Sequence, residues 1–460
     1  MVVDDRSAVA AQRAWWGAMA VALLVFVVVG RHQWFVRDDW AVLISRKEVF
    51  DGGETLRSYF IAQDGHFMAF PVLVYQALDG VFGLGSYWPF LAVCLAAHVA
   101  IVVLVRRLCL QVGVRPWTAT LVCSILLVLG SGWENIVFAI QITFNFSLLA
   151  FLVHLVLVDH DGPADRRDVL GTVVAVLGVA SSGFGPVFVA GVTALLVIRR
   201  RWIEAVIAAV PSALLYLWWL SAYGDDQAAA TAGRPLSKIP VFVDTGVTAV
   251  FAAVTPLSSL VGVSILGSVA VLMWRARDPR AHDLLVVLAG TMVAMFVGIG
   301  VERAGFGVET AASSRYVYMG AVLVVPMFAL ALDLLGRLGR PALLAGWVLV
   351  LSAVVVQAGE LYQRAGDWSA ISRGEQHQLA LIAGATLPAS FDPDQVCLAF
   401  SPDVRCEHLP DLVARGAITP VQPATEADRV FLDGLADGVV LPAPGPTQAP
   451  TLGPTLGPTP

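Results

Sequence analysis

Long uncharged apolar runs, most of them bounded by Arg or Asp, limit what this 460-residue chain can fold into. A helix that crosses a bilayer needs about 20 mostly apolar residues, because the hydrocarbon core offers no water to the backbone polar groups. Only 14% of the residues are charged, whereas a soluble domain carries roughly a quarter, so polar groups cannot cover the surface. The sequence therefore predicts an all-α, polytopic transmembrane helical bundle.

Eleven of these runs are predicted to cross the membrane. They lie near residues 14–30, 86–105, 117–132, 136–158, 169–182, 186–198, 205–223, 257–274, 284–301, 317–335 and 341–358. The first run follows Arg13 and ends without a small-residue cleavage site, which indicates an uncleaved anchor. Residues 241–256 are also apolar but carry Asp244 and three threonines. We interpret them as an interfacial or re-entrant segment, and whether they span the membrane stays open.

The distribution of Lys and Arg sets the predicted orientation, because short loops rich in these residues stay in the cytoplasm. With the N-terminus in the cytoplasm, 15 of the 24 basic residues before residue 359 fall on the inner side. This count requires residues 169–198 to form two short spans, broken at the SSGFGP sequence of residues 181–186. A single span there would place the three arginines of residues 199–201 outside. We therefore predict a multi-pass plasma-membrane protein with a cytoplasmic N-terminus and an extracytoplasmic C-terminus.

The composition divides the chain into three parts. Residues 1–358 form the predicted transmembrane domain, and residues 359–440 form a small extracytoplasmic region, here called the C-terminal region. Residues 441–460 are rich in Pro, Gly and Thr and are predicted to be disordered, because they cannot bury a core. An exported location permits a disulfide between Cys397 and Cys406, which lie outside the apolar runs, with two free thiols as the alternative.

The first outer loop, residues 31–66, carries an adjacent carboxylate pair, Asp38 and Asp39, between aromatic residues. Partial desolvation of such a pair at the membrane surface raises a carboxyl pKa and suits a general base. The alternative is a solvated loop in which Arg37 pairs with Asp38 while Trp34 and Trp40 anchor the loop at the interface.

Two further outer features carry candidate site residues. Glu134 lies in a short turn between two apolar spans. An ionisable group is costly there, so Glu134 is a candidate functional residue, and the alternative is that it caps a helix. Arg315 lies at the outer mouth of a predicted span, where its guanidinium can bind phosphate oxygens through paired hydrogen bonds. The alternative for Arg315 is an interfacial anchor formed with Tyr316.

Several function classes lack support in the sequence. It contains no glycine-rich nucleotide loop with the required lysine, no paired CxxC and no HExxH. The predicted cytoplasmic loops are too short for a nucleotide-binding domain, which argues against an ATP-driven pump. The basic residues are scattered between apolar runs and form no single patch, which argues against nucleic-acid binding.

Taken together, four short motifs resemble the polytopic glycosyltransferases of the GT-C fold class, in an uncharacterised actinobacterial branch. They are the RDDW sequence of residues 37–40 directly after the first span, DGH at residues 64–66, FGLGSYWP at residues 82–89 and SRY at residues 314–316. The resemblance covers roughly residues 10–340. It implies an enzyme that transfers a hexosyl or pentosyl group from a polyprenyl-phosphate carrier to a cell-envelope acceptor on the outer face.

The resemblance also implies roles for individual residues. Asp38 or Asp39 would take the proton from the acceptor hydroxyl, while Arg315 and His66 would stabilise the departing phosphate. The other residues assigned to substrate binding are Tyr316, Asp64, Glu134 and Arg37. The implied partners are the lipid bilayer, the polyprenyl-phosphate sugar donor and the acceptor, without nucleic acid. Some members of the class need a divalent cation and others do not, so the metal and cofactor remain unknown.

Two alternative functions stay open. One is a transporter or flippase of a lipid-linked or anionic substrate, and the other is a non-catalytic cell-envelope assembly protein. Convergence of the candidate residues in one outward-facing cavity would favour the enzyme. A charged path across the bilayer would favour transport.

Overall fold

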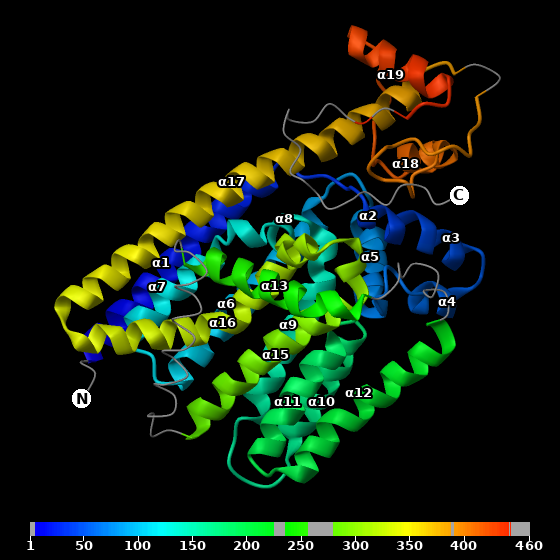
Figure 1. The fold of residues 1–460 in the computed structure, drawn as a ribbon. Helices are drawn as coiled ribbons and strands as arrows, with labels where there is room; N and C mark the ends of the chain where they lie inside the picture. The colour runs from blue at the N-terminus through cyan, green and yellow to red at the C-terminus, as the bar shows by residue number, and fades with distance from the viewer. Residues whose placement is uncertain (1–4, 225–234, 256–278, 388–390, 441, 443–460) are drawn as a thin grey trace.

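The computed structural model describes residues 5–224, 235–255, 279–387, 391–440 and 442. The regular secondary structure of these residues is helical, and their extended pairing is limited to two isolated bridges (Figure 1). Eight of the described helices are long and apolar enough to cross a membrane. Three more apolar helices are shorter, namely α5 (Ala69–Phe82), α7 (Pro116–Leu127) and α11 (Gly185–Ile198). The predicted all-α, multi-pass architecture is confirmed.

Ten of the eleven predicted spans fall on described helices. Besides α7 and α11, these helices are α1 (Asp5–Gly30), α6 (Trp88–Gln111), α9 (Ile142–Val158), α10 (Arg166–Val179), α12 (Trp202–Tyr223), α15 (Pro279–Arg303), α16 (Ser314–Leu335) and α17 (Arg340–Gly384). The span predicted at residues 257–274 lies outside the described residues. The shorter helices between and after the spans are α2 (Asp38–Trp40), α3 (Arg46–Asp51), α4 (Thr55–Phe60), α8 (Glu134–Val137), α18 (Leu409–Ala414) and α19 (Glu426–Ala436).

The uncharged stretch of residues 169–198 forms two helices, α10 and α11, as predicted from its helix breakers. The end of α11 returns to the side on which α10 begins. There Arg201 donates to the carbonyl of Val158 at 2.6 Å and lies 3.3 Å from Asp168 of α10, while Arg199 pairs with Asp159 at 2.7 Å. The two-helix interpretation of this stretch is therefore correct.

The apolar stretch that we interpret as interfacial or re-entrant forms one helix, α13 (Ile239–Val254). Together with the turn before it, this helix is long and apolar enough to cross a membrane. In Figure 1 it lies across α15 and α16 and does not run alongside them. Gly246 permits this crossing, because a β-carbon at that position would lie 2.2 Å from the ring of Phe296 on α15.

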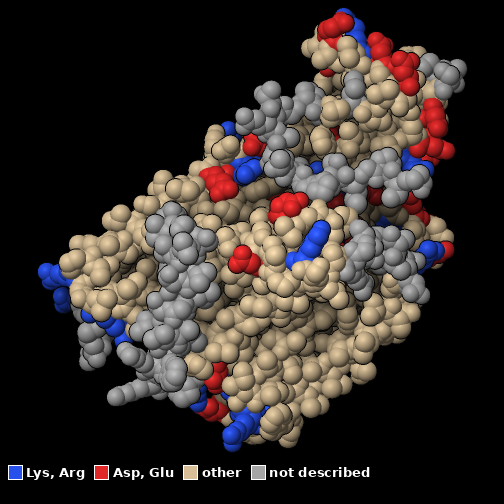
Figure 2. Space-filling model, in the orientation of Figure 1, with Lys and Arg blue, Asp and Glu red and all other residues tan. Residues whose placement is uncertain are grey.

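Charged side chains gather towards the two ends of the bundle. Figure 2 shows them at the lower end and across the upper part of the visible face, with a broad uncharged band between. At the lower end, Arg115 bonds to the buried carboxylate of Asp333 at 2.6 Å, which ties the start of α7 to the end of α16. Figure 1 places the N-terminus and α19 at opposite ends of the molecule.

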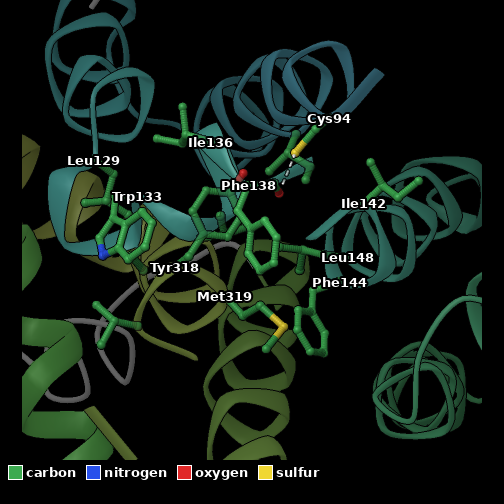
Figure 3. Packing of buried hydrophobic residues seen from close by; sticks show 14 of the residues in the cluster. Cys94, Leu129, Trp133, Ile136, Phe138, Ile142, Phe144, Leu148, Tyr318 and Met319 are labelled. Carbon is green, nitrogen blue, oxygen red and sulfur yellow. Dashed lines mark hydrogen bonds between the residues drawn. The ribbon is translucent and has the colours of Figure 1, made fainter. Parts of the chain in front are cut away.

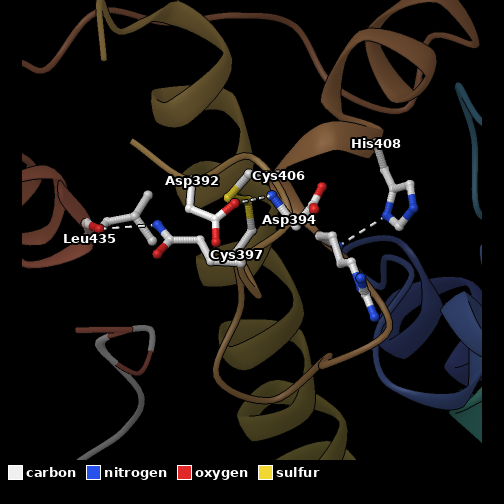
Figure 4. Close-up of a disulfide and its surroundings, with 8 residues drawn as sticks. Asp392, Asp394, Cys397, Cys406, His408 and Leu435 are labelled. Carbon is white, nitrogen blue, oxygen red and sulfur yellow. Dashed lines mark hydrogen bonds between the residues drawn. A yellow bond between two sulfur atoms is a disulfide. The ribbon is translucent and has the colours of Figure 1, made fainter. Parts of the chain in front are cut away.

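The C-terminal region continues directly from the last span, because α17 runs for 45 residues without a break. The predicted boundary at residues 358–359 therefore falls inside a helix. Cys397 and Cys406 are bridged, as predicted (Figure 4). The other three cysteines are buried and unbridged.

A buried apolar cluster connects the spans, and part of it is drawn in Figure 3. Small residues let its helices approach closely, as is common between membrane helices. A β-carbon at Gly130 would lie 2.5 Å from the carbonyl oxygen of Gln357 on α17, and one at Gly132 would lie 2.9 Å from Tyr318 on α16. This tight packing brings the turn that carries Ser131 and Glu134 against both helices.

Candidate active site

A cavity of about 740 Å³ opens where the first outer loop, the turn before α8, the start of α16 and the middle of α17 meet. Six of the predicted site residues line it, namely Arg37, Asp38, Asp64, Glu134, Arg315 and Tyr316. His66 lines a smaller adjoining cavity of about 70 Å³, whose wall also includes Asp38, Asp64, Arg315 and Tyr316. The structure thus brings seven of the eight predicted site residues together.

The two adjacent aspartates of the first loop point to different surroundings. Asp39 is fully buried away from both cavities, where it accepts hydrogen bonds from the Tyr75 hydroxyl at 2.6 Å, the Tyr87 hydroxyl at 3.3 Å and the Val36 amide at 3.1 Å. Asp38 lines both cavities. Of the two carboxylates that the sequence offers as the base, Asp38 is the one placed to meet a substrate.

The surroundings of Asp38 make it a stronger base than an ordinary aspartate. Burial, and after it the nearby Asp64, raise the pKa of Asp38 to about 6, although Arg315 and Arg37 oppose the shift. Burial also raises the pKa of Asp39 to about 7, against the hydrogen bonds from Tyr75 and Val36. At neutral pH, Asp38 is therefore largely ionised and still able to accept a proton.

Glu134 and Arg315 are joined through the starts of their helices. The Glu134 carboxylate accepts the Arg315 backbone N–H at 3.1 Å, and the Glu134 backbone N–H donates to the Ser314 hydroxyl at 3.2 Å. Glu134 therefore caps α16, which is the structural alternative considered for it, and it also faces the cavity. This exchange of hydrogen bonds fixes where Arg315 enters the site.

Among the residues that the structure describes, no carboxylate pairs with the guanidinium of Arg315. Its Nε is buried and makes no hydrogen bond within the described part of the chain, and its Cζ lies 5.6 Å from the centre of the Tyr316 ring. Arg37 likewise forms no ion pair with Asp38 or with another described carboxylate. Its guanidinium lies over the rings of Trp368 and Phe400, at 5.8 and 5.9 Å. Two arginines of the cavity are thus available to an anion.

Three charged residues of the cavity wall, Arg303, Glu360 and Arg364, are not among the predicted site residues. Arg303 ends α15 and donates to the Asp64 carbonyl at 3.0 Å. Its position beside Glu302, at the predicted outer end of a span, is the sequence signal that could have identified it as a site residue. Glu360 and Arg364 lie on α17, beyond the predicted domain boundary. The sequence carries no signal that this helix continues over the cavity.

His66 is a neutral hydrogen-bonding group. Burial, together with the nearby Arg303 and Arg315, lowers the pKa of His66 to about 3. Its Nδ1 accepts the Gly183 N–H at 3.3 Å, in the turn between α10 and α11. Glycine is required there, because a β-carbon would lie 2.9 Å from Nδ1. His66 can therefore donate from Nε2 to a ligand, but it adds no positive charge near neutral pH.

A group of side chains with metal-ligand spacing occurs elsewhere among the described residues. It consists of His160, Asp165 and Asp168, at the end of the bundle where α10 begins. Arg201 already contacts this group, at 3.2 Å from His160 Nε2 and 3.3 Å from Asp168. Of the cavity residues, Asp38, Asp64, Glu134 and Glu360 carry the carboxylate oxygen atoms that a divalent cation would prefer.

The helical arrangement is that of the GT-C class of polytopic membrane proteins, as the sequence motifs implied. No protein-family model matches the chain, and no curated protein matches it by sequence. Two solved structures of ArnT from Cupriavidus metallidurans share its fold. The one bound to undecaprenyl phosphate has 13% sequence identity and a TM-score of 0.52, and the apo one has 15% and 0.51. Each match covers 92% of this chain and 88% of ArnT, and at these identities the likeness concerns the fold.

Proposed function

We propose that this chain is a membrane glycosyltransferase that moves a hexosyl or pentosyl group from a polyprenyl-phosphate carrier to a cell-envelope acceptor on the outer face of the membrane. One observation carries the proposal: a basic carboxylate, Asp38, and an unpaired guanidinium, Arg315, face the same cavity. The fold shared with ArnT, one structure of which holds undecaprenyl phosphate, supports a lipid-linked donor.

The proposed reaction is a single displacement. Asp38 accepts the proton of the acceptor hydroxyl as its oxygen forms a bond to the anomeric carbon of the sugar. The bond between that carbon and the phosphate oxygen breaks, and its electron pair leaves on the lipid phosphate. Arg315 and Arg37 then offset the charge that develops on the phosphate, as preorganised donors do for a leaving anion.

The adjoining cavity suits the sugar ring. Gln63, His66 and Gln141 line it, and Gln141 Oε1 is buried without a hydrogen-bond partner among the described residues. A sugar hydroxyl would supply the missing donor.

The experiment that tests the function uses the purified chain in detergent. It is incubated with polyprenyl-phosphate hexoses and pentoses, and release of polyprenyl phosphate and of transferred or hydrolysed sugar is measured. We expect turnover with at least one donor and none with the Asp38→Asn variant. Transbilayer movement of an intact donor in proteoliposomes, without sugar release, would instead support the transporter.

The pH profile of the reaction follows from the state of Asp38. Only the ionised carboxylate accepts a proton, and the pKa of Asp38 is raised to about 6, so kcat/KM should rise about tenfold per pH unit below pH 6 and level off above it. Rates from pH 4.5 to 8.5 check this, with the unfolding temperature measured over the same range as a control. A rate that is flat down to pH 4.5 would contradict the role of Asp38.

The proposed orientation can be tested with single cysteines, because the native thiols are buried or bridged. Ala427 on α19 and Ala164 before α10 are both exposed. We expect an impermeant maleimide to label Ala427→Cys in intact cells and Ala164→Cys only after permeabilisation. The reverse pattern would place the cavity on the cytoplasmic side.

A further inference from the structure

A short loop of the C-terminal region, residues 397–406, contacts Arg37 of the cavity wall and is here called the bridged loop. Its ends are joined by the disulfide (Figure 4). Inside the loop, the Cys397 N–H donates to the Val404 carbonyl at 2.9 Å. Phe400 and Ser401 lie near its middle. These two residues connect the C-terminal region to the first outer loop.

Ser401 links α17 to the backbone of Arg37. The fully buried Ser401 hydroxyl accepts the Arg37 N–H at 2.8 Å and donates to the Glu375 carboxylate at 2.6 Å. The other oxygen of Glu375, which is also fully buried, accepts the Phe400 N–H at 3.1 Å. Glu375 therefore fixes the bridged loop, and Ser401 passes that constraint to Arg37.

The backbone of Arg37 needs such a constraint. Its φ of 53° and ψ of −122° lie where residues with a β-carbon rarely occur, and strained backbone of this kind persists only when its surroundings impose it. Arg37 directly precedes Asp38, so its dihedral angles set the direction in which Asp38 points. Phe400 also contacts the Arg37 guanidinium, opposite Trp368 of α17.

The other hydrogen bonds of this turn are local. Val36 and Asp39 bond to each other through backbone and side chain, and the Trp40 N–H donates to the Arg37 carbonyl at 2.8 Å. Within the described residues, the recorded hydrogen bond that reaches the turn's backbone from another part of the chain is the one from Arg37 to Ser401. The local bonds close the turn, and Ser401 joins it to the rest of the protein.

We infer that Ser401, supported by Glu375 and the disulfide, is a positioning residue that directs Asp38 into the cavity, so that the C-terminal region completes the active site. This inference rests on the proposed function of the cavity and adds a role for a segment outside the part of the sequence that resembles the GT-C class. Cross-linking the ends of the bridged loop limits the conformations open to it, which favours the one that places Ser401 against Arg37.

The first test is kinetic. Ser401→Ala removes the acceptor of the Arg37 N–H and leaves the disulfide in place, so kcat should fall about 10- to 100-fold while the KM for the donor stays unchanged. The matched control is His377→Ala, which removes a contact to Asp428 elsewhere in the C-terminal region and should keep full kcat. The inference would be overturned if kcat fell only in proportion to the amount of folded protein. It would also be overturned if His377→Ala lost as much kcat as Ser401→Ala.

The second test needs no catalytic activity. In an Asp38→Cys variant, the rate at which a small methanethiosulfonate modifies the introduced thiol reports its position in the cavity. Adding Ser401→Ala should change this rate several-fold, and adding His377→Ala should not. An unchanged rate with Ser401→Ala would overturn the positioning role, even where sugar transfer is observed. If the rate changes but the protein with its natural Asp38 transfers no sugar, the positioning role is supported and the proposed function is not.

Discussion

Asp38→Asn is expected to abolish sugar transfer while leaving the protein folded. The amide cannot accept the proton of the acceptor hydroxyl, and general-base catalysis contributes roughly 10²- to 10⁴-fold to a rate. Asp38 lines both cavities and makes no recorded hydrogen bond that the fold needs. We therefore expect the loss to appear in kcat, measured as release of polyprenyl phosphate from a saturating donor.

The stability of the same variant should move in the opposite direction to its activity. The pKa of Asp38 is raised above its ordinary value of 3.8, so its contribution to stability is complete below about pH 3.8 and is lost as the pH rises through about 6. Above pH 6 the buried carboxylate carries a cost that the amide does not. The apparent unfolding temperature of Asp38→Asn at pH 8 should therefore equal or exceed that of the natural protein.

Asp39→Asn is the matched control for this prediction. The Tyr75 hydroxyl and the Val36 N–H donate to different oxygens of Asp39, so the NH2 group of an asparagine would face one of these two donors. An unsatisfied buried group costs about 1–3 kcal/mol. We expect a lower unfolding temperature and partial activity from Asp39→Asn. If Asp38→Asn kept full activity, or if Asp39→Asn alone lost it, Asp38 could not be the base.

Much of the fold follows from features that act locally along the chain. The lengths of the apolar runs and the positions of the arginines predict the spans. The helix-breaking residues at 181–186 predict the division into α10 and α11, because glycine and proline interrupt helices regardless of tertiary context. The candidate residues were identifiable for a similar reason: a charged group beside an apolar run must have a compensating environment. Asp38, Glu134 and Arg315 meet that description, and the structure brings them to one cavity.

The remaining features depend on contacts between distant residues. Which aspartate faces the cavity is set by the backbone of Arg37, whose N–H donates to Ser401, 364 residues further along the chain. Arg364 enters the wall because α17 continues over the cavity, and no local signal marks that path. Sequence patterns describe faces and lengths of helices, whereas these features are set by tertiary packing.

Arg315→Ala is expected to lower kcat/KM for the lipid-linked donor by about 10²- to 10³-fold, the effect of removing one donor that stabilises a developing anion. The Arg315 backbone N–H, which donates to Glu134, is kept in this variant, so the start of α16 should be unchanged. The KM for the acceptor should also stay unchanged. Arg315→Lys should recover part of the rate, because lysine keeps the charge without the paired donors of a guanidinium.

Arg364→Ala separates the role of Arg315 from the total charge of the cavity. Both arginines line the cavity, but Arg364 lies 3.9 Å from the Glu360 carboxylate on the same helix, whereas Arg315 has no described carboxylate partner. If an unpaired guanidinium binds the phosphate, Arg364→Ala should retain most of the activity, and inhibition by free polyprenyl phosphate should weaken only in Arg315→Ala. Equal losses in the two variants would mean that the cavity attracts the donor by overall charge, and the specific contact between Arg315 and phosphate would have to be abandoned.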